Sequence, residues 1–227
     1  RREGRAVKPE SRQHALRPRA VVFDMDGLLL NTEALRMQAL DDCARDLGLV
    51  LKTDLFAALI GGATPQSRAA LEAHIRDDLP RDFWTHYRRF ADVRMAEVEP
   101  MPGALALLDH LQTRDIPRAI ATSATRASVE RFCGRFDLLP RFSAVIAKGD
   151  YERAKPAPDA YLAAARSLGV APEDCLALED SYNGVQAAVA AGMTTIMAPD
   201  VLPATDEMRR ICFAVVSDLH EVRAHIP

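Results

Sequence analysis

The order in which helical and strand-like segments alternate is the feature that most constrains how this chain can fold. Short apolar runs recur along most of its length and are separated by segments with helical spacing. These runs predict strands at 20–23, 118–121, 144–146, 175–178, 195–197 and 214–216. Such alternation is typical of parallel strands joined by right-handed helical crossovers. We therefore expect an α/β fold with a doubly wound parallel sheet.

One long interval breaks the alternation. Between the first strand and the second, from Thr32 to about Val98, the spacing is helical and no strand is indicated. Further helices are expected at 53–60, 66–78 and 82–97, and a run with Pro100, Pro102 and Gly103 marks the boundary. The pattern predicts a basic leader (1–19), a doubly wound (Rossmann-like) core (20–31 and 101–227) and an inserted α-helical cap domain (32–100).

Composition and charge narrow the class of protein. Of the 227 residues, 48% are hydrophobic and 27% are charged, as in an ordinary globular protein, and no apolar run approaches the roughly 18 residues that span a bilayer. The four cysteines lie far apart without metal-ligand spacing, so reduced thiols and a cytoplasmic location are expected.

The charge is unevenly distributed. Residues 1–19 carry a net charge of +5. Because the whole chain carries −3, the remaining residues carry −8. A basic leader could touch nucleic acid, a membrane surface or an organelle importer, but a flexible tail is the simpler interpretation. Because the acidic body suits a polyphosphate poorly, we expect neither a nucleic-acid nor a membrane partner.

Polar residues follow four of the expected strands. They are Asp24 and Asp26 after the first, Thr122, Ser123 and Ala124 after the second, Lys155 beyond the third, and Glu179 and Asp180 after the fourth. Ligands of doubly wound sheets bind beyond the carboxyl ends of the strands, so these side chains should share one edge.

Their chemistry suits phosphoryl transfer. Crowded carboxylates repel one another unless a cation lies between them, and oxygen ligands without His or Cys suit magnesium. Lys155, the nearby hydroxyls and a helix beginning near Thr125 could hold a phosphate. A carboxylate attacking a phosphate dianion needs this neutralisation. We therefore expect a Mg²⁺-dependent enzyme in which Asp24 attacks a phosphate ester.

Four segments together carry a family resemblance. FDMDGLLLNTE, IATSA, KPAPDAY and LEDSYNGVQAA resemble the four motifs of haloacid dehalogenase superfamily hydrolases with a helical cap, and the match runs from about Arg19 to Val216. The resemblance implies that Asp24 is the nucleophile of an aspartyl-phosphate. It also implies that Asp26 protonates the leaving oxygen and then activates water.

The same resemblance assigns the binding groups. It implies phosphate binding by the set Thr122, Ser123, Ala124 and Lys155. It implies magnesium binding by the Asp24 carboxylate, the Asp26 main-chain carbonyl and Asp180, with Glu179 orienting metal-bound water.

The fourth segment most resembles the branch of beta-phosphoglucomutases and sugar-phosphate phosphatases. Those mutases use a His in the first cap helix and an Arg in the cap loop to hold a sugar bisphosphate. Here Arg36 takes the helix position, the loop LIGGATPQ contains no Arg, and Asn31 replaces the usual Asp. A phosphatase acting on a small sugar phosphate is therefore preferred, with a sugar phosphomutase as the alternative. The candidate cap residues for substrate are Arg36, Gly61, Gly62 and Thr64.

Other classes fit less well. Haloacid dehalogenases proper lack the second Asp, and phosphonoacetaldehyde hydrolases use a cap Lys, for which Lys52 is a poor candidate. A catalytically silent binding protein would not need the full set of motifs. We expect a monomer or a dimer whose partner is a small-molecule phosphate ester.

Overall fold

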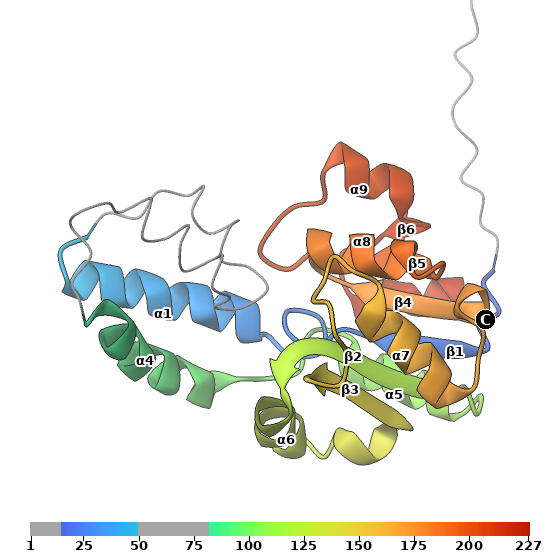
Figure 1. Ribbon diagram of the computed structural model, residues 1–227, viewed down its shortest axis with the longest axis horizontal. Coiled ribbons are helices and arrows are strands. Elements are labelled where there is room, and N and C mark those ends of the chain that lie inside the picture. The colour runs from blue at the N-terminus through green and yellow to red at the C-terminus, as the bar shows by residue number, and fades with distance from the viewer. Residues whose placement is uncertain (1–14, 50–81) are drawn as a thin grey trace, which may run out of the picture.

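The computed structural model describes residues 15–49 and 82–227, and its centre is a parallel sheet flanked by helices (Figure 1). The sheet has six strands in the order β3-β2-β1-β4-β5-β6. The strands are β1 (Ala20–Phe23), β2 (Arg118–Thr125), β3 (Ala144–Lys148), β4 (Cys175–Glu179), β5 (Thr194–Met197) and β6 (Ala214–Val215). The expected doubly wound parallel sheet is confirmed. Its order reverses between β1 and β4, where such sheets bind ligands.

Helices cover both faces of this sheet. The described helices are α1 (Thr32–Asp46), α4 (Phe83–Arg94), α5 (Ala104–Gln112), α6 (Arg126–Gly134), α7 (Asp159–Leu168), α8 (Tyr182–Ala190), α9 (Asp206–Ile211) and α10 (Leu219–Val222). In β1, Val21 and Phe23 pack in the cluster that includes residues of α5, α6 and α10, whereas Ala20 and Val22 pack in the cluster with α7 and α8. Because both faces are buried, the strand is apolar throughout.

Strand β2 differs from expectation. It continues through Thr125 instead of ending at residue 121, and its pairing with β3 shifts register between Ala121 and Thr125. Thr125 is then the N-cap of α6, and its side chain accepts a hydrogen bond from Ser128 N at 3.2 Å. Thr122 and Ser123 therefore lie within the irregular end of the strand. Helix α9, which has a Thr205 N-cap, was not expected.

Helices α1 and α4 lie to one side of the sheet and pack on each other (Figure 1). They share a small apolar cluster around Leu40, Cys43 and Phe83, and Arg94 donates two hydrogen bonds to Asp42 at 2.6 and 2.8 Å. The helices expected at 53–60 and 66–78 lie outside the described residues. The division into core and cap domains stays a prediction.

Two chain segments connect these helices to the sheet. They run beside each other, because Asn31 N donates to Glu99 O at 3.1 Å and Met101 N donates to Leu29 O at 2.9 Å. The Asn31 side chain also accepts from Glu99 N at 2.8 Å. The Asn that replaces the usual Asp of the motif thus links the two connecting segments, 28–32 and 99–103, which we call the crossings.

The start of the described chain is attached to the sheet domain. Leu16 N donates to His225 O at 2.7 Å, and Arg19 N donates to Asp174 O at 2.9 Å. Leu16 and Arg19, which lie in the last five residues of the expected leader, therefore have defined contacts. Within the described residues, no helix is both long enough and apolar enough to cross a bilayer.

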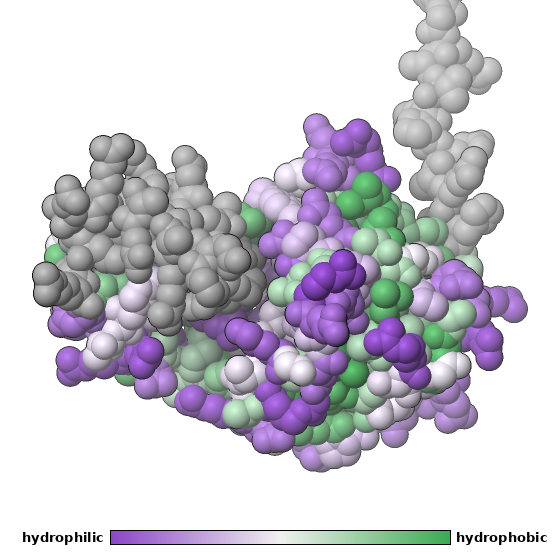
Figure 2. All heavy atoms as spheres, in the orientation of Figure 1, coloured by the Kyte–Doolittle hydropathy of each residue, from purple (hydrophilic) through white to green (hydrophobic). Residues whose placement is uncertain are grey.

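On the face of the molecule shown in Figure 2, hydrophilic side chains lie beside a band of apolar ones. The exposed large hydrophobic residues in the described part are Val93, Leu105, Val189 and Phe213. Three of them lie in α4, α5 and α8, and Phe213 lies just before β6.

Candidate active site

Asp24 lies directly after β1, at the carboxyl edge of the sheet. Its N–H donates to Leu178 O of β4 at 3.0 Å, which places the side chain between two strand ends. The residue is 7% exposed, and Lys155 Nζ donates to its Oδ1 at 2.5 Å. A buried carboxylate and a buried ammonium therefore meet at the position where the order of the strands reverses.

Lys155 bridges two carboxylates. Its Nζ donates to Glu179 Oε1 at 2.6 Å and to Ala121 O at 3.1 Å, in addition to Asp24. Burial alone would lower the pKa of Lys155, but Asp24 and Glu179 outweigh it and hold this pKa well above its usual value. Tyr161 of α7 completes the group by donating from its hydroxyl to Glu179 Oε1 at 2.7 Å.

Glu179, the last residue of β4, is fully buried and engaged by protein groups on both oxygens. Its Oε2 accepts from Asp180 N at 3.0 Å, from Ser181 N at 3.2 Å and from Ser181 Oγ at 3.1 Å. Burial opposes its ionisation, but the Lys155 ammonium holds the pKa of Glu179 below its usual value. The sequence predicts that Glu179 follows a strand ending at residue 178, whereas it is the last residue of β4. The family resemblance implies that Glu179 orients a metal-bound water. In this structure it organises Lys155 and the start of α8.

Asp26 is held by a separate set of donors. Its Oδ1 accepts from Thr32 Oγ1 at 2.7 Å and pairs with Arg36 at 3.0 Å, and its Oδ2 accepts from Thr122 Oγ1 at 3.4 Å. Arg36 also pairs with Glu33 at 3.0 Å. The first turns of α1 thus reach the sheet edge and contact the second Asp of the motif.

The candidate phosphate-binding segment is the end of β2. Thr122 is fully buried, and its Oγ1 accepts from Ala124 N at 3.0 Å. Ser123 and Ala124 are half-buried beside it. The candidate cap residues Gly61, Gly62 and Thr64 lie outside the described residues.

Asp180 faces the turn that follows β1. It is 4% exposed, and no cation lies within ion-pair distance of its carboxylate in the described parts of the chain. Gly27 has a φ of +82°, and a Cβ at this residue would overlap the Asp180 carboxylate. Glycine is therefore required at this turn, both for its left-handed backbone and for the space it leaves.

The charges at this edge do not balance. Among the described ion pairs, Lys155 pairs with Asp24 and Glu179, and Asp180 has no cationic partner. Burial raises the pKa of Asp24 to about 8, with Lys155 opposing the rise and Glu179 and Asp26 adding to it. Burial, Glu179 and Asp24 likewise raise the pKa of Asp180 well above its usual value.

A bound divalent cation would resolve this imbalance. It would favour the ionised form of both Asp24 and Asp180, and their oxygen ligands suit magnesium. In the described residues no three His, Cys, Asp or Glu side chains form a metal cluster. That finding fits the expected donor set, since it contains two carboxylates and one main-chain carbonyl, and magnesium keeps several waters.

Sequence reasoning missed two of the residues that complete the site. Tyr161 lies in the segment KPAPDAY, and Thr32 lies in FDMDGLLLNTE, but both fall in segments that read as amphipathic helix. Their hydroxyls find Glu179 and Asp26 only because the sheet places α7 and α1 against its edge. The one signal available was their position inside segments that carry the family resemblance.

Comparisons with known proteins agree on one family. The family model of haloacid dehalogenase-like hydrolases matches residues 18–192. A Drosophila melanogaster protein named probable pseudouridine-5'-phosphatase is 38% identical over 190 residues, covering 79% of this chain and 80% of its own. Hexitol phosphatase A of Escherichia coli (strain K12) is 32% identical over 198 residues, covering 85% and 89%.

A solved structure extends the similarity to three dimensions. CbbY from Rhodobacter sphaeroides in complex with phosphate superimposes with a TM-score of 0.74 at 26% identity. The match covers 91% of this chain and 96% of that one.

Proposed function

Because this chain belongs to the haloacid dehalogenase-like hydrolases, we propose that it is a magnesium-dependent phosphatase of a small sugar phosphate. The family resemblance and the expected enzyme class, phosphoric monoester hydrolase, are confirmed by these comparisons. The observation that carries the finer proposal is the bridge from Lys155 Nζ to Asp24 at 2.5 Å and to Glu179 at 2.6 Å. It holds the carboxylate that we propose as the nucleophile beside a cation at the switch point of the sheet.

The proposed first step transfers the phosphoryl group to the protein. A carboxylate oxygen of Asp24 forms a bond to phosphorus while the ester P–O bond breaks, and Asp26 gives its proton to the departing sugar oxygen. Lys155 and the Thr122–Ala124 segment would bind the phosphate oxygens and offset their charge. The two carboxyl groups come from one short turn, so both can face the same phosphate.

The proposed second step releases phosphate. Asp26, now ionised, takes a proton from a water that attacks phosphorus, and the bond to Asp24 breaks. Acid and base assistance of this kind is typically worth about two to four powers of ten in rate. Magnesium, held by Asp24, Asp180 and the Asp26 carbonyl, would supply positive charge for the phosphate oxygens.

The relatives support a sugar phosphate as substrate. Hexitol phosphatase A and the pseudouridine-5'-phosphatase are both named for phosphorylated polyols or sugar conjugates. A substrate of this size would present one phosphate to Asp24 and its hydroxyls to the first turns of α1.

A sugar phosphomutase is the alternative, and Arg36 is the observation that favours it. Its guanidinium reaches Asp26 at 3.0 Å, where it could hold a second phosphate. However, the same nitrogen already pairs with Glu33, so two carboxylates share its charge. A weakly held second phosphate would let water compete for the aspartyl-phosphate, which is why we prefer a phosphatase.

One incubation separates the two activities. The protein is mixed with magnesium, beta-glucose 1-phosphate and a trace of glucose 1,6-bisphosphate, and both free phosphate and glucose 6-phosphate are followed. We expect phosphate release that does not need the bisphosphate, with Asp24→Asn as the blank. Glucose 6-phosphate accumulating much faster than phosphate would establish the mutase instead.

A further inference from the structure

Tyr161 of α7 lies against the bridge that Lys155 forms between Asp24 and Glu179. Its side chain is fully buried, and its hydroxyl donates to Glu179 Oε1 at 2.7 Å. The same hydroxyl oxygen lies 3.4 Å from Lys155 Nζ, and the centre of the ring lies 4.9 Å from that nitrogen. One buried tyrosine thus contacts both members of an ion pair in the candidate active site. We call these four side chains the Lys155 group.

The ammonium of Lys155 has no N–H group to spare. An ammonium carries three N–H groups. Three protein oxygens accept from this one, namely Asp24 Oδ1 at 2.5 Å, Glu179 Oε1 at 2.6 Å and Ala121 O at 3.1 Å. The Lys155 side chain is 6% exposed, so it is shielded from solvent. A phosphate that binds to Lys155 must therefore take an N–H group from one of these three oxygens.

Glu179 is an acceptor that can release Lys155 and still keep a donor. A carboxylate oxygen has two lone pairs, and Glu179 Oε1 accepts from both Lys155 and Tyr161. The other oxygen, Oε2, is held separately by donors of Asp180 and Ser181. When Lys155 turns an N–H group to a phosphate, the Tyr161 hydroxyl still satisfies Oε1. Without that hydroxyl, Oε1 would lose its last donor among the described hydrogen bonds, which is costly for a buried charged group.

The ring of Tyr161 supports the same movement. A cation is attracted to the face of an aromatic ring, and this attraction does not depend on which N–H group points at the ring. Lys155 can therefore turn its N–H groups while the ring continues to stabilise its charge. Phenylalanine at this position would keep the ring and remove only the hydroxyl.

We propose that Tyr161 is a positioning residue that holds Glu179 in place when Lys155 turns an N–H group toward the substrate phosphate. The proposal rests on the function proposed above, because Lys155 is given the phosphate there. Tyr161 itself does not touch the phosphate in this scheme and acts only through Glu179 and Lys155.

The test measures how tightly the protein binds inorganic phosphate. Calorimetric titration with phosphate in the presence of magnesium gives the Kd without requiring turnover, and Lys155→Ala serves as the blank. We expect Tyr161→Phe to raise this Kd about tenfold, because Glu179 Oε1 loses its remaining donor only when phosphate is bound. The kcat/KM for p-nitrophenyl phosphate should fall by a similar factor.

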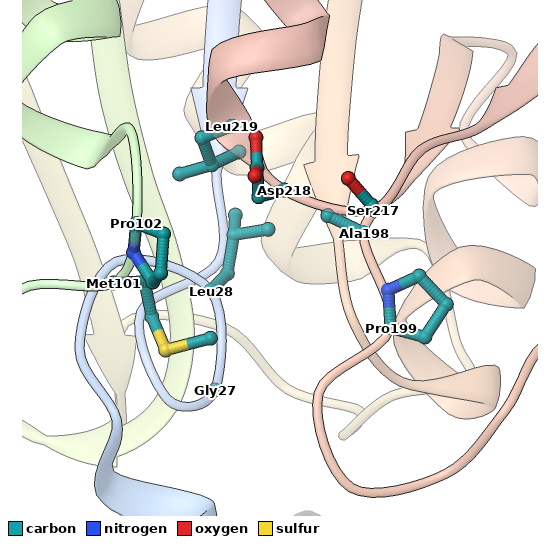
Figure 3. Close-up of a pocket in the computed structure, with 9 residues that line it drawn as sticks. All are labelled: Gly27, Leu28, Met101, Pro102, Ala198, Pro199, Ser217, Asp218 and Leu219. Atoms are coloured by element: carbon teal, nitrogen blue, oxygen red, sulfur yellow. The ribbon is translucent and has the colours of Figure 1, made fainter.

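Two controls separate this role from general damage. Tyr182→Phe also removes one tyrosine hydroxyl, which donates to Pro203 O at 2.6 Å in the loop after β5. Leu219 is 2% exposed and lines the small pocket in Figure 3, and none of the residues that line this pocket belongs to the Lys155 group. Leu219→Val should lower the thermal midpoint of the ligand-free protein at least as much as Tyr161→Phe. Neither control should change the Kd for phosphate by more than about twofold.

An unchanged Kd in Tyr161→Phe would overturn the positioning role, and so would an equal rise of the Kd in Tyr182→Phe or Leu219→Val. If the unchanged protein binds phosphate but hydrolyses no phosphate ester, the proposed phosphatase fails, and the Kd of Tyr161→Phe still decides the role of Tyr161. If the unchanged protein binds no phosphate, the positioning role is overturned together with the proposed phosphate site.

Discussion

Asp24 combines two properties that conflict in the absence of a cation. It is buried with a raised pKa, yet the nucleophile that we propose it to be must be ionised, and the Lys155 ammonium alone does not restore its usual pKa. The proposed magnesium would supply the missing positive charge.

Asp24→Asn should abolish turnover without unfolding the protein. The amide cannot form an acyl phosphate, so we expect a loss of at least about a thousandfold in kcat. Beryllofluoride with magnesium should bind the unchanged protein and protect it from thermal unfolding, but should not bind the variant. Near-normal turnover in a variant whose Asn is verified by mass spectrometry as undeamidated would sink the assignment of Asp24 as nucleophile.

The raised pKa values also predict how stability depends on pH. An unfolded Asp releases its proton near pH 4, whereas folded Asp24 holds its proton up to about pH 8, so folding retains a proton between these values. The free energy of unfolding of the metal-free protein should therefore fall as pH rises across this window, by at most about 1.4 kcal/mol per pH unit for each such group. The pKa of Asp180 is also raised, so Asp180 adds to this fall of the free energy of unfolding with rising pH.

Urea unfolding in a chelator at several pH values measures this slope. Asp180→Asn should flatten it, and magnesium should raise the stability most at the alkaline end, where both carboxylates are ionised. A metal-free stability that rises between pH 5 and 8 would contradict the burial of these acids.

The first turn of α8 shows how one element shapes the site. Ser181, its N-cap, accepts from Gly184 N at 3.1 Å and donates to Glu179. A Cβ at Gly184 would overlap the Glu179 carboxylate, so this helix can pass the buried acid only with glycine at that position.

Gly184→Ala should therefore destabilise the protein although alanine favours helix. We expect the free energy of unfolding to fall by at least about 2 kcal/mol, because the fully buried Glu179 side chain must shift and its hydrogen bonds must break. Hydrolysis of p-nitrophenyl phosphate should fall as well, since Glu179 would release Lys155. In contrast, a Cβ at Gly134 in α6 would meet no atom within 4 Å. Gly134→Ala should therefore raise the free energy of unfolding by about 0.5–1 kcal/mol. Equal stability of the two variants in urea unfolding would refute this account.

The elements themselves were predictable where periodicity is strong. All six strands coincide with apolar runs in the sequence, and the polar residues after these strands do gather at one edge of the sheet. The extension of β2 to Thr125 was missed because Thr122 and Ser123 break the apolar run, and because the register shift depends on pairing with β3. Helix α9 was missed because its six residues are too short for a periodic signal.

The assembled site was predictable only in part. Asp24, Asp26, Lys155, Glu179 and Asp180 lie together because each ends or follows a strand of one parallel sheet. Thr32 and Tyr161, which donate to Asp26 and Glu179, instead lie in helices α1 and α7. Which helix meets which loop depends on tertiary packing and leaves no periodic pattern.

We predict that the two crossings act as hinges. Segments 28–32 and 99–103 join α1 and α4 to the sheet, and a few main-chain hydrogen bonds such as Asn31 to Glu99 hold them together. Rotation about these segments would bring the helices over the sheet edge. Closure over a bound phosphate would exclude water from the reacting groups.

Closure should shorten the distance between the helices and the sheet domain when the transition-state mimic binds. Val93 of α4 is 65% exposed and Val189 of α8 is 36% exposed, so spin labels on cysteines at these positions report that distance. The four native cysteines are buried, which limits background labelling. We expect magnesium with beryllofluoride to shorten the Val93–Val189 distance, measured by pulsed electron resonance. A second pair within the sheet domain, Leu105 of α5 with Val189, should keep its distance. If both pairs stay unchanged with the mimic bound, the crossings are not hinges, and water must be excluded from Asp24 by other means.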